Sequence, residues 1–242
     1  MVRQLAAEGT ALVLVARSGS RLVELAGELA VPVEVLEADL ADPSQVEAVA
    51  ARIADAAEPV DLVVNNAGFG LDADLVERPA EDWLEMVQVN VSAVVRLSHE
   101  ALRHFSGVAR TGRSGGTVLN VASVAGFAGT AGLGVYSATK SFLITFGLAL
   151  HDEGRPAGVR VSTLCPGLTH TGFHARAGIG DLGLPDLVWA DADEVARAGL
   201  QGAERGRALV VPGVVNKVAV TGSRLVPLWA QRRLAGAVRG RR

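Results

Sequence analysis

Cysteine, tyrosine and lysine are almost missing from this sequence. Its 242 residues include one cysteine, Cys165, and one tyrosine, Tyr136, while two lysines stand against 21 arginines. A single cysteine excludes an internal disulfide and a metal site built from cysteines, and the five histidines show no metal-ligand spacing. Since no signal-peptide pattern precedes Arg3, we expect a protein of the reducing cytoplasm.

Long apolar runs are also missing. None approaches the roughly 20 residues that a membrane-spanning helix needs. Hydrophobic residues nevertheless make up 49% of the chain, with 28 glycines, a composition typical of a packed globular domain and not of a disordered or fibrous chain. The length allows one substantial domain and is too short for two ordinary ones.

Acidic residues disappear after Glu204. Residues 1–204 contain 14 basic and 26 acidic residues, whereas the remaining segment contains nine basic residues and no acid. The net charge of −3 argues against general nucleic-acid binding. We divide the chain into one domain, 1–215, and a basic C-terminal extension, 216–242. This extension has two open interpretations, a solvated tail or a basic amphipathic helix that contacts a membrane surface or a partner.

Apolar runs with strand character alternate with segments of helical periodicity. Thr10 to Ala16, TALVLVA, is a continuous apolar run of the kind found in a strand that is covered on both faces. The expected strands are 10–16, 33–39, 60–64, 117–122, 159–164 and 208–211. The expected helices are 2–8, 20–29, 43–56, 80–105, 135–151 and 193–203. This alternation predicts an α/β fold whose parallel sheet carries helices on both faces and binds ligands at the carboxyl ends of its strands.

Small and polar residues follow several of these strands. Asn65-Asn66-Ala67-Gly68 comes directly after one strand, and Ser123, with Gly126 and Gly129 behind it, comes after another. Small residues would let a ligand approach the backbone. Each cluster taken alone is equally typical of an ordinary turn.

Tyr136 and Lys140 lie four residues apart at the start of an expected helix, so their side chains share one face. The spacing alone is typical of an exposed helix pair. However, a chain that uses arginine almost everywhere retains a lysine here, where a compact charge serves better than a planar guanidinium.

Together these motifs resemble the short-chain dehydrogenase/reductase family. Ser123, Tyr136 and Lys140 occur in the family's order, with Asn90 in the preceding long helix and Asn65 to Gly68 after a strand. Residues Cys165 to Thr171 match the family's proline-glycine loop beside the nicotinamide. The resemblance extends from residue 1 to about residue 215 and implies a doubly wound, Rossmann-like sheet in a three-layer αβα arrangement.

The resemblance also implies roles. Tyr136 would be the general acid in carbonyl reduction and the base in alcohol oxidation. Ser123 would hydrogen-bond the substrate oxygen, Lys140 would hold the nicotinamide ribose and lower the pKa of the phenol, and Asn90 would fix a water. The residues expected at the cofactor are Arg17, Asp39, Asn65, Ala67, Gly68, Tyr136, Lys140, Pro166, Gly167, Thr169 and Thr171.

Cofactor choice depends on the end of the strand 10–16. An acidic residue there would bind the ribose hydroxyls of NAD, but this chain has Arg17 and Ser18. Arginine suits a 2'-phosphate, which favours NADP(H) over NAD(H). Asp39 matches the family position beside the adenine, and it could equally be an aspartate that precedes a helix.

The family begins with a strand and a glycine-rich phosphate loop, and this sequence begins inside the helix that follows them. In the family's strand order that first strand lies between the strands 10–16 and 60–64, so two inner edges would lack partners. An unpaired buried backbone group costs about 1 to 3 kcal/mol. We therefore expect the chain as given to fold poorly, and we hypothesise that Met1 is a misassigned start.

The segment 170–190 corresponds to the family's substrate lid. Its apolar residues predict a hydrophobic ketone, aldehyde or secondary alcohol, with Phe127 and Leu133 on the opposite wall, although simple packing explains these residues nearly as well. The lid residues are Phe173, Ile179, Leu182, Leu184 and Trp189. Helices 80–105 and 135–151 are apolar on more than one face, which in this family indicates a homodimer or homotetramer.

Two functions compete with an oxidoreductase. A binding or scaffold protein that has lost its cofactor would explain the missing glycine loop, but it would not need Asn90, Ser123, Tyr136 and Lys140 together. Another nucleotide-binding enzyme, such as a methyltransferase, would not require the tyrosine and lysine pair.

Overall fold

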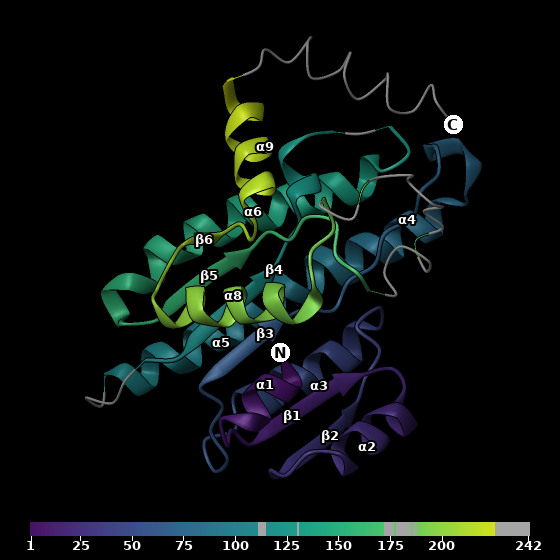
Figure 1. The fold of residues 1–242 in the computed structure, drawn as a ribbon. Helices are drawn as coiled ribbons and strands as arrows, with labels where there is room; N and C mark the ends of the chain where they lie inside the picture. Colours follow the sequence, from purple (N-terminus) through teal and green to yellow (C-terminus); the bar gives the residue numbers. More distant parts are fainter. Residues whose placement is uncertain (111–114, 130, 172–176, 178–184, 186–187, 226–242) are drawn as a thin grey trace.

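The structure, a computed structural model, describes residues 1–110, 115–129, 131–171, 177, 185 and 188–225 (Figure 1). Strands and helices alternate along the chain, as the sequence predicts. The strands are β1 (Leu12–Ala16), β2 (Val33–Glu37), β3 (Leu62–Asn65), β4 (Thr117–Val121), β5 (Arg160–Leu164) and β6 (Leu209–Val210). The α-helices are α1 (Val2–Ala7), α2 (Gly19–Gly27), α3 (Pro43–Ile53), α4 (Ala80–Val87), α5 (Ala93–Ala109), α6 (Gly134–Gly154), α8 (Ala192–Glu204) and α9 (Val214–Leu225).

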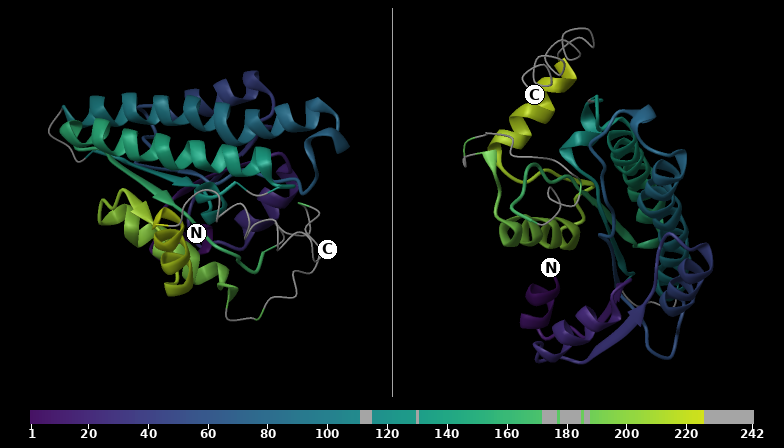
Figure 2. Two further views of the ribbon diagram at one scale, coloured as in Figure 1. Left: turned by 90° about the horizontal axis from the view of Figure 1, so that it is seen from above. Right: turned by 90° about the vertical axis from the view of Figure 1, so that its right-hand side faces the viewer.

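All strand pairs are parallel, and the strands form two sheets, β1-β2 and β3-β4-β5-β6. Helices α5 and α6 cover one face of the four-stranded sheet and α8 lies on the other face (Figure 2). This arrangement is the three-layer α/β fold expected from the alternating pattern.

The sheet is divided between β1 and β3. One edge of β1 pairs with β2, and the Leu12 amide donates to the Pro32 carbonyl beside it. Among the described residues, no strand pairs with the other edge of β1. β3 is likewise paired only with β4 in the described part of the chain. These are the two inner edges expected from the sequence to lack a partner. A cavity of about 690 Å³ lies at the start of β3, lined by residues of α1, α5 and α8.

Helices α3 and α5 join the two parts of the fold. Buried side chains of α3, among them Val49 and Ile53, share one core cluster with Leu97 and Phe105 of α5. Because α3 belongs to the β1-β2 side and α5 covers the larger sheet, this apolar contact holds the two sheets together.

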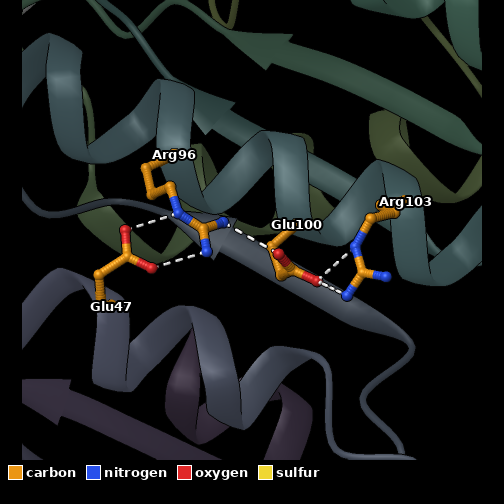
Figure 3. Close-up of polar contacts among 4 residues, drawn as sticks. All are labelled: Glu47, Arg96, Glu100 and Arg103. Carbon is orange, nitrogen blue, oxygen red and sulfur yellow. Dashed lines mark hydrogen bonds and ion pairs between the residues drawn. The ribbon is translucent and has the colours of Figure 1, made fainter.

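Arg96 reinforces the contact (Figure 3). Its Nε lies 2.7 Å from Oε1 of Glu47 on α3, and its Nη1 lies 3.0 Å from Oε2 of Glu100 on α5. Arg103 also bonds Glu100. Burial raises the pKa of Glu100, but the hydrogen bonds from Arg103 and Arg96 outweigh it and lower the pKa. Arg96 therefore connects a nearly buried carboxylate to an exposed one across the helix pair.

The helix expected over 80–105 is wrong in one respect, because a π-helical segment, η2 (Gln88–Ser92), separates α4 from α5, and α5 continues to Ala109. A π-helical turn inside an α-helix is frequent at functional sites. Here it contains Asn90, one of the predicted site residues. The other predicted elements agree to within a few residues, and Asp42 caps α3 as expected, since its side chain accepts from the Ser44 amide at 2.8 Å.

The boundary predicted at 215/216 falls inside α9. Residues 226–242 lie outside the described residues, as do most of the predicted lid residues, namely Phe173, Ile179, Leu182 and Leu184. Within the described part of the chain, no helix has the length and apolar character needed to cross a bilayer.

Candidate active site

Ser123 and Tyr136 are brought into contact by the turn after β4. Ser123 caps the 3-10 helix η3 (Val124–Phe127), and its Oγ accepts from the Ala125 amide at 3.1 Å. Tyr136 lies in the first turn of α6 with 8% of its surface exposed. The Ser123 side chain hydrogen-bonds the Tyr136 phenol. Both hydroxyl groups therefore meet at one point beyond the carboxyl end of β4.

Gly126 makes this contact possible. A Cβ at this position would lie 2.7 Å from the carbonyl carbon of Lys140 and 2.7 Å from Cδ1 of Ile144. Real Cβ atoms do not approach backbone so closely, so only glycine lets η3 lie directly on α6. The close packing of η3 on α6 keeps Ser123 beside Tyr136.

Lys140 lies one turn after Tyr136 and is buried. Its Nζ donates to the Val121 carbonyl at 2.9 Å and lies 5.7 Å from the centroid of the Tyr136 ring. Burial lowers the pKa of Lys140 to about 8, while the neighbouring Cys165 thiol acts in the opposite direction. The spacing argument from the sequence predicted the shared face but not this carbonyl partner.

Burial raises the pKa of Tyr136, and the hydrogen bond from Ser123 partly offsets this. Desolvation disfavours the phenolate, so the phenol is protonated at neutral pH in this structure. A protonated phenol suits a general acid. The lowering of the Tyr136 pKa by Lys140 stays a prediction.

Asn90 connects the loop after β3 to α6. Its Oδ1 accepts from the Phe69 amide at 3.1 Å, and its Nδ2 donates to the Phe69 carbonyl at 2.9 Å and to Thr139 Oγ1 at 3.1 Å. Thr139 in turn donates to the Tyr136 carbonyl at 2.7 Å. A Cβ on Gly68 would lie 2.9 Å from Asn90 Oδ1 and 3.4 Å from Lys140 Nζ. Sequence reasoning missed Thr139, and the role of Asn90 in holding a water stays a prediction.

Asn65 joins two strands and a helix. It is 6% exposed, and its Nδ2 donates to Asn120 Oδ1 at 2.8 Å and to Ser98 Oγ at 3.1 Å. Because Asn65 and Asn120 are opposite each other in the register of β3 and β4, the amide holds the strand ends together. Of the residues predicted here to contact a cofactor, Ala67 and Gly68 are exposed, whereas the Asn65 side chain is occupied by protein partners.

The proline-glycine loop after β5 lies beside η3. The Pro166 carbonyl accepts from the Val124 amide at 2.8 Å, and Thr169 Oγ1 donates to the Gly167 carbonyl at 3.0 Å. Thr171 is exposed at the end of the described part of this loop. His170, the residue before it, stacks on Trp189 with 5.0 Å between ring centroids. The loop is thus fixed against the element that carries Ser123.

Arg17 is exposed at the end of β1. Its guanidinium lies 3.9 Å from Glu85 of α4, and both side chains remain largely exposed, so the ion pair is weak and the cation stays accessible. Asp39 accepts from the Ala41 amide at 2.9 Å. The cap of α3 is Asp42, which leaves a contact between Asp39 and an adenine as a prediction.

Of the two predicted wall residues, Phe127 is half-buried and packs against the core cluster of Val94, Leu143 and Ile144. Leu133 is also half-buried, at the residue before α6. Within the described residues, no group of three or more histidine, cysteine or acidic side chains is placed to hold a metal ion.

The arrangement fits a nicotinamide nucleotide. Ala67 and Gly68 add no bulky side chain at the carboxyl end of β3, and a Cβ on Gly68 would lie 2.9 Å from Asn90 Oδ1. A flat ring could approach such backbone closely, beside the lysine and the two hydroxyl groups.

Comparisons with known proteins agree with this geometry. Residues 1–179 match the family model of the short chain dehydrogenases. The chain belongs to the short-chain dehydrogenase/reductase family. The enzyme is therefore an oxidoreductase that acts on CH–OH groups.

Three similar proteins illustrate the range of the family. A sulfoacetaldehyde reductase 2 of Chromohalobacter salexigens is 34% identical, with 78% of the enzyme and 75% of the relative aligned. A short-chain dehydrogenase from Sphingobium yanoikuyae, solved in complex with NADPH, is 32% identical with a TM-score of 0.80, covering 93% and 87% of the two chains. A bulky-bulky ketone specific alcohol dehydrogenase from Comamonas testosteroni is 26% identical with a TM-score of 0.76, covering 93% and 86%.

Proposed function

We propose that the enzyme interconverts a hydrophobic ketone or aldehyde and its alcohol with NADP(H) as the cofactor. The observation that carries this proposal is the contact between the Ser123 and Tyr136 hydroxyl groups one turn from a buried Lys140. A scaffold protein gains nothing from keeping a lysine ammonium nearly buried at a cost in stability.

The bound cofactor would supply or accept the hydride. The protonated Tyr136 phenol would donate its proton to the carbonyl oxygen of the substrate during reduction. Ser123 would donate a hydrogen bond to the same oxygen as negative charge develops on it. Lys140 would hold its positive charge beside the phenol and stabilise the phenolate that remains after proton transfer.

The preference for NADP(H) is supported by Arg17, an accessible guanidinium at the end of β1. The bidentate geometry of arginine matches a phosphate. The relative from Sphingobium yanoikuyae has been solved with NADPH. Asp39, Pro166, Thr169 and Thr171 complete the proposed cofactor contacts.

A hydrophobic substrate is proposed because the side chains packed around Tyr136 are apolar. Phe69, Val135 and Ala125 pack against the buried cluster that contains Tyr136 and Trp83. The alcohol dehydrogenase from Comamonas testosteroni is specific for bulky-bulky ketones. We further propose that the enzyme works in the cytoplasm as a homodimer or homotetramer. Phe142 of α6, which stacks on Phe146 and is 39% exposed, suits such an interface.

The test compares the wild-type enzyme with Tyr136→Phe. Oxidation of NADPH is followed by absorbance with a panel of aryl and cyclic ketones and aldehydes, and NADPH binding is followed by nicotinamide fluorescence. We expect the substitution to lower turnover at least about 1,000-fold, as for the loss of a proton donor, while leaving NADPH binding nearly unchanged. Unchanged turnover would remove Tyr136 from the mechanism.

Binding should also be measured for this chain beside a version extended upstream in frame. Binding by the extended version alone would indicate that the site needs a strand between β1 and β3. If both versions fold and neither binds NADPH or NADH, the proposed NADP(H)-dependent reaction at this site is wrong.

A further inference from the structure

Helix α9 presents an unusual row of exposed apolar side chains. Val214, Val215 and Val218 are 75%, 48% and 67% exposed. Val214 and Val218 are four residues apart and therefore lie on one face of the helix. Single exposed valines are common, but a cluster on one helix face marks an interaction surface.

The orientation of α9 is fixed by its opposite side. Val220 is buried, with 8% of its surface exposed. Asn216 Nδ2 donates to the Pro212 carbonyl at 2.9 Å, and its Oδ1 lies 2.2 Å from the position that a Cβ on Gly167 would take. Figures 1 and 2 show that α9 projects away from the sheet and its covering helices. The exposed valines therefore point outward on a projecting element and not into a groove.

Cations lie at the base of α9. Lys217 of α9, Arg205 and Arg207 line a cavity of about 320 Å³ between α8, β6 and α9, together with one acid, Glu194. All three cations are exposed, and none forms an ion pair with any described residue. An apolar surface with unpaired cations beside it is complementary to an anionic lipid surface, which offers apolar chains to the valines and negative charge to the cations.

The charge of the sequence follows the same division. Residues 1–204 have a net charge of −12, whereas the chain after Glu204 carries nine basic residues and no acid. Beyond α9 the sequence continues with five arginines among Leu228, Trp229 and Leu234. Tryptophan and arginine together are typical of segments that lie at a membrane surface.

We propose that α9, with the cations Lys217, Arg205 and Arg207 at its base, docks the enzyme onto the surface of an anionic lipid bilayer. The valines would enter the boundary between headgroups and acyl chains, and the cations would face the lipid phosphates. Each lysine or arginine near such a surface adds to the attraction. The proposed contact is peripheral, with α9 lying against the membrane surface.

Docking would also place the candidate site close to the membrane. The contact between Asn216 and Gly167 joins α9 to the loop beside η3, the helix that Ser123 caps. A membrane-partitioned carbonyl compound could then enter the site directly. This consequence depends on the proposed function, whereas membrane binding itself does not.

The experiment is flotation of the full 242-residue chain with large unilamellar vesicles. One set contains phosphatidylcholine alone, and the other contains phosphatidylcholine with about 30% phosphatidylglycerol, a fraction that gives a strongly negative surface potential. We expect at least a tenfold higher bound fraction on the anionic vesicles and loss of binding at high salt. The absence of binding to anionic vesicles, or equal binding to both sets, would overturn the proposal.

Matched variants locate the surface. Val218→Asp and the double variant Arg205→Gln/Arg207→Gln should each lower vesicle binding at least fivefold. Val23→Asp is the control, because Val23 is a helical valine on α2 with a similar exposure of 61%. Since all these positions are exposed, circular dichroism should show unchanged folding. Equal vesicle binding by Val218→Asp and the wild type would assign any membrane contact to another surface. Because flotation requires no turnover, its failure would leave the oxidoreductase proposal intact.

Discussion

Lys140 donates through Nζ to the Val121 carbonyl at 2.9 Å, at the last residue of β4. This bond ties the proposed active-site cation to the sheet and holds it below the Tyr136 ring. It also satisfies only part of the hydrogen-bonding capacity of an ammonium group, which has three N–H donors. The buried Lys140 ammonium therefore lowers the free energy of unfolding while it remains in position in the site.

The first prediction concerns the pH dependence of this cost. The pKa of Lys140 is lowered from 10.5 to about 8 by burial, so between these values the unfolded chain binds more protons than the folded enzyme. The free energy of unfolding therefore rises with pH in this window, and the rise from Lys140 amounts to about 2 kcal/mol between pH 7 and 9.5.

Urea unfolding of the wild type and Lys140→Met at both pH values would measure this contribution. Methionine has similar length and no charge, so its stability should lack this rise. The difference between the two proteins isolates Lys140 from other titrating groups. A difference that stays constant between pH 7 and 9.5 would contradict the lowered pKa.

The second prediction concerns Gly126. Gly126→Ala would force a Cβ to within 2.7 Å of the Lys140 backbone, so η3 must move away from α6 and carry Ser123 from Tyr136. We expect turnover to fall at least tenfold and the free energy of unfolding to fall by about 1 to 3 kcal/mol. Gly129→Ala in the same loop is the control, because nothing lies within 4 Å of its Cβ. Similar losses of turnover and stability in Gly126→Ala and Gly129→Ala would show that any substitution in this loop is damaging. The contact of Gly126 with α6 would then not be the cause.

The third prediction concerns the amide that joins β3 and β4. Asn65→Ala removes the donor to Asn120 Oδ1 and Ser98 Oγ and leaves buried polar atoms without partners. We expect a loss of about 1 to 3 kcal/mol in unfolding free energy, measured by urea denaturation. Asn66→Ala, at the exposed neighbour, should change stability by less than about 0.5 kcal/mol. If Asn66→Ala proves the more destabilising, the assignment of the clamp to Asn65 is wrong.

The contrast between Asn65 and Asn66 illustrates what the sequence could supply. Apolar periodicity predicted the strands, because strand formation follows a local pattern. The parallel order placed Asn65, Ser123 and Pro166 at the carboxyl edge of the sheet, because this placement follows general rules of parallel sheets. Which amide turns inward depends on the phase of β3 against β4. That phase is set by pairing between residues 55 positions apart, which no local pattern contains.

Asn90 shows the same limit. The residue was predicted from the family resemblance, but the apolar pattern of 80–105 indicated one continuous helix. The π-helical turn contains Asn90, whose side chain bonds both backbone groups of Phe69, a tertiary contact that no local helix propensity contains. Likewise, Lys140 could be placed on a helix face from spacing, but its Val121 partner required the fold.

The fourth prediction concerns cofactor choice. Arg17 is exposed at the end of β1, and its only described ionic neighbour is Glu85 at 3.9 Å, so little competes for its guanidinium. Arg17→Asp would replace a phosphate-binding cation with an acid that repels a 2'-phosphate and can accept hydrogen bonds from ribose hydroxyls. We expect the ratio of kcat/KM for NADPH over NADH to fall at least about 100-fold, which corresponds to about 2.7 kcal/mol. Glu85→Gln tests the alternative that the ion pair itself orders the β1 end, because it removes the pair and keeps the cation. Glu85→Gln should leave the ratio unchanged or raise it, and an unaltered ratio in Arg17→Asp would refute the role of Arg17.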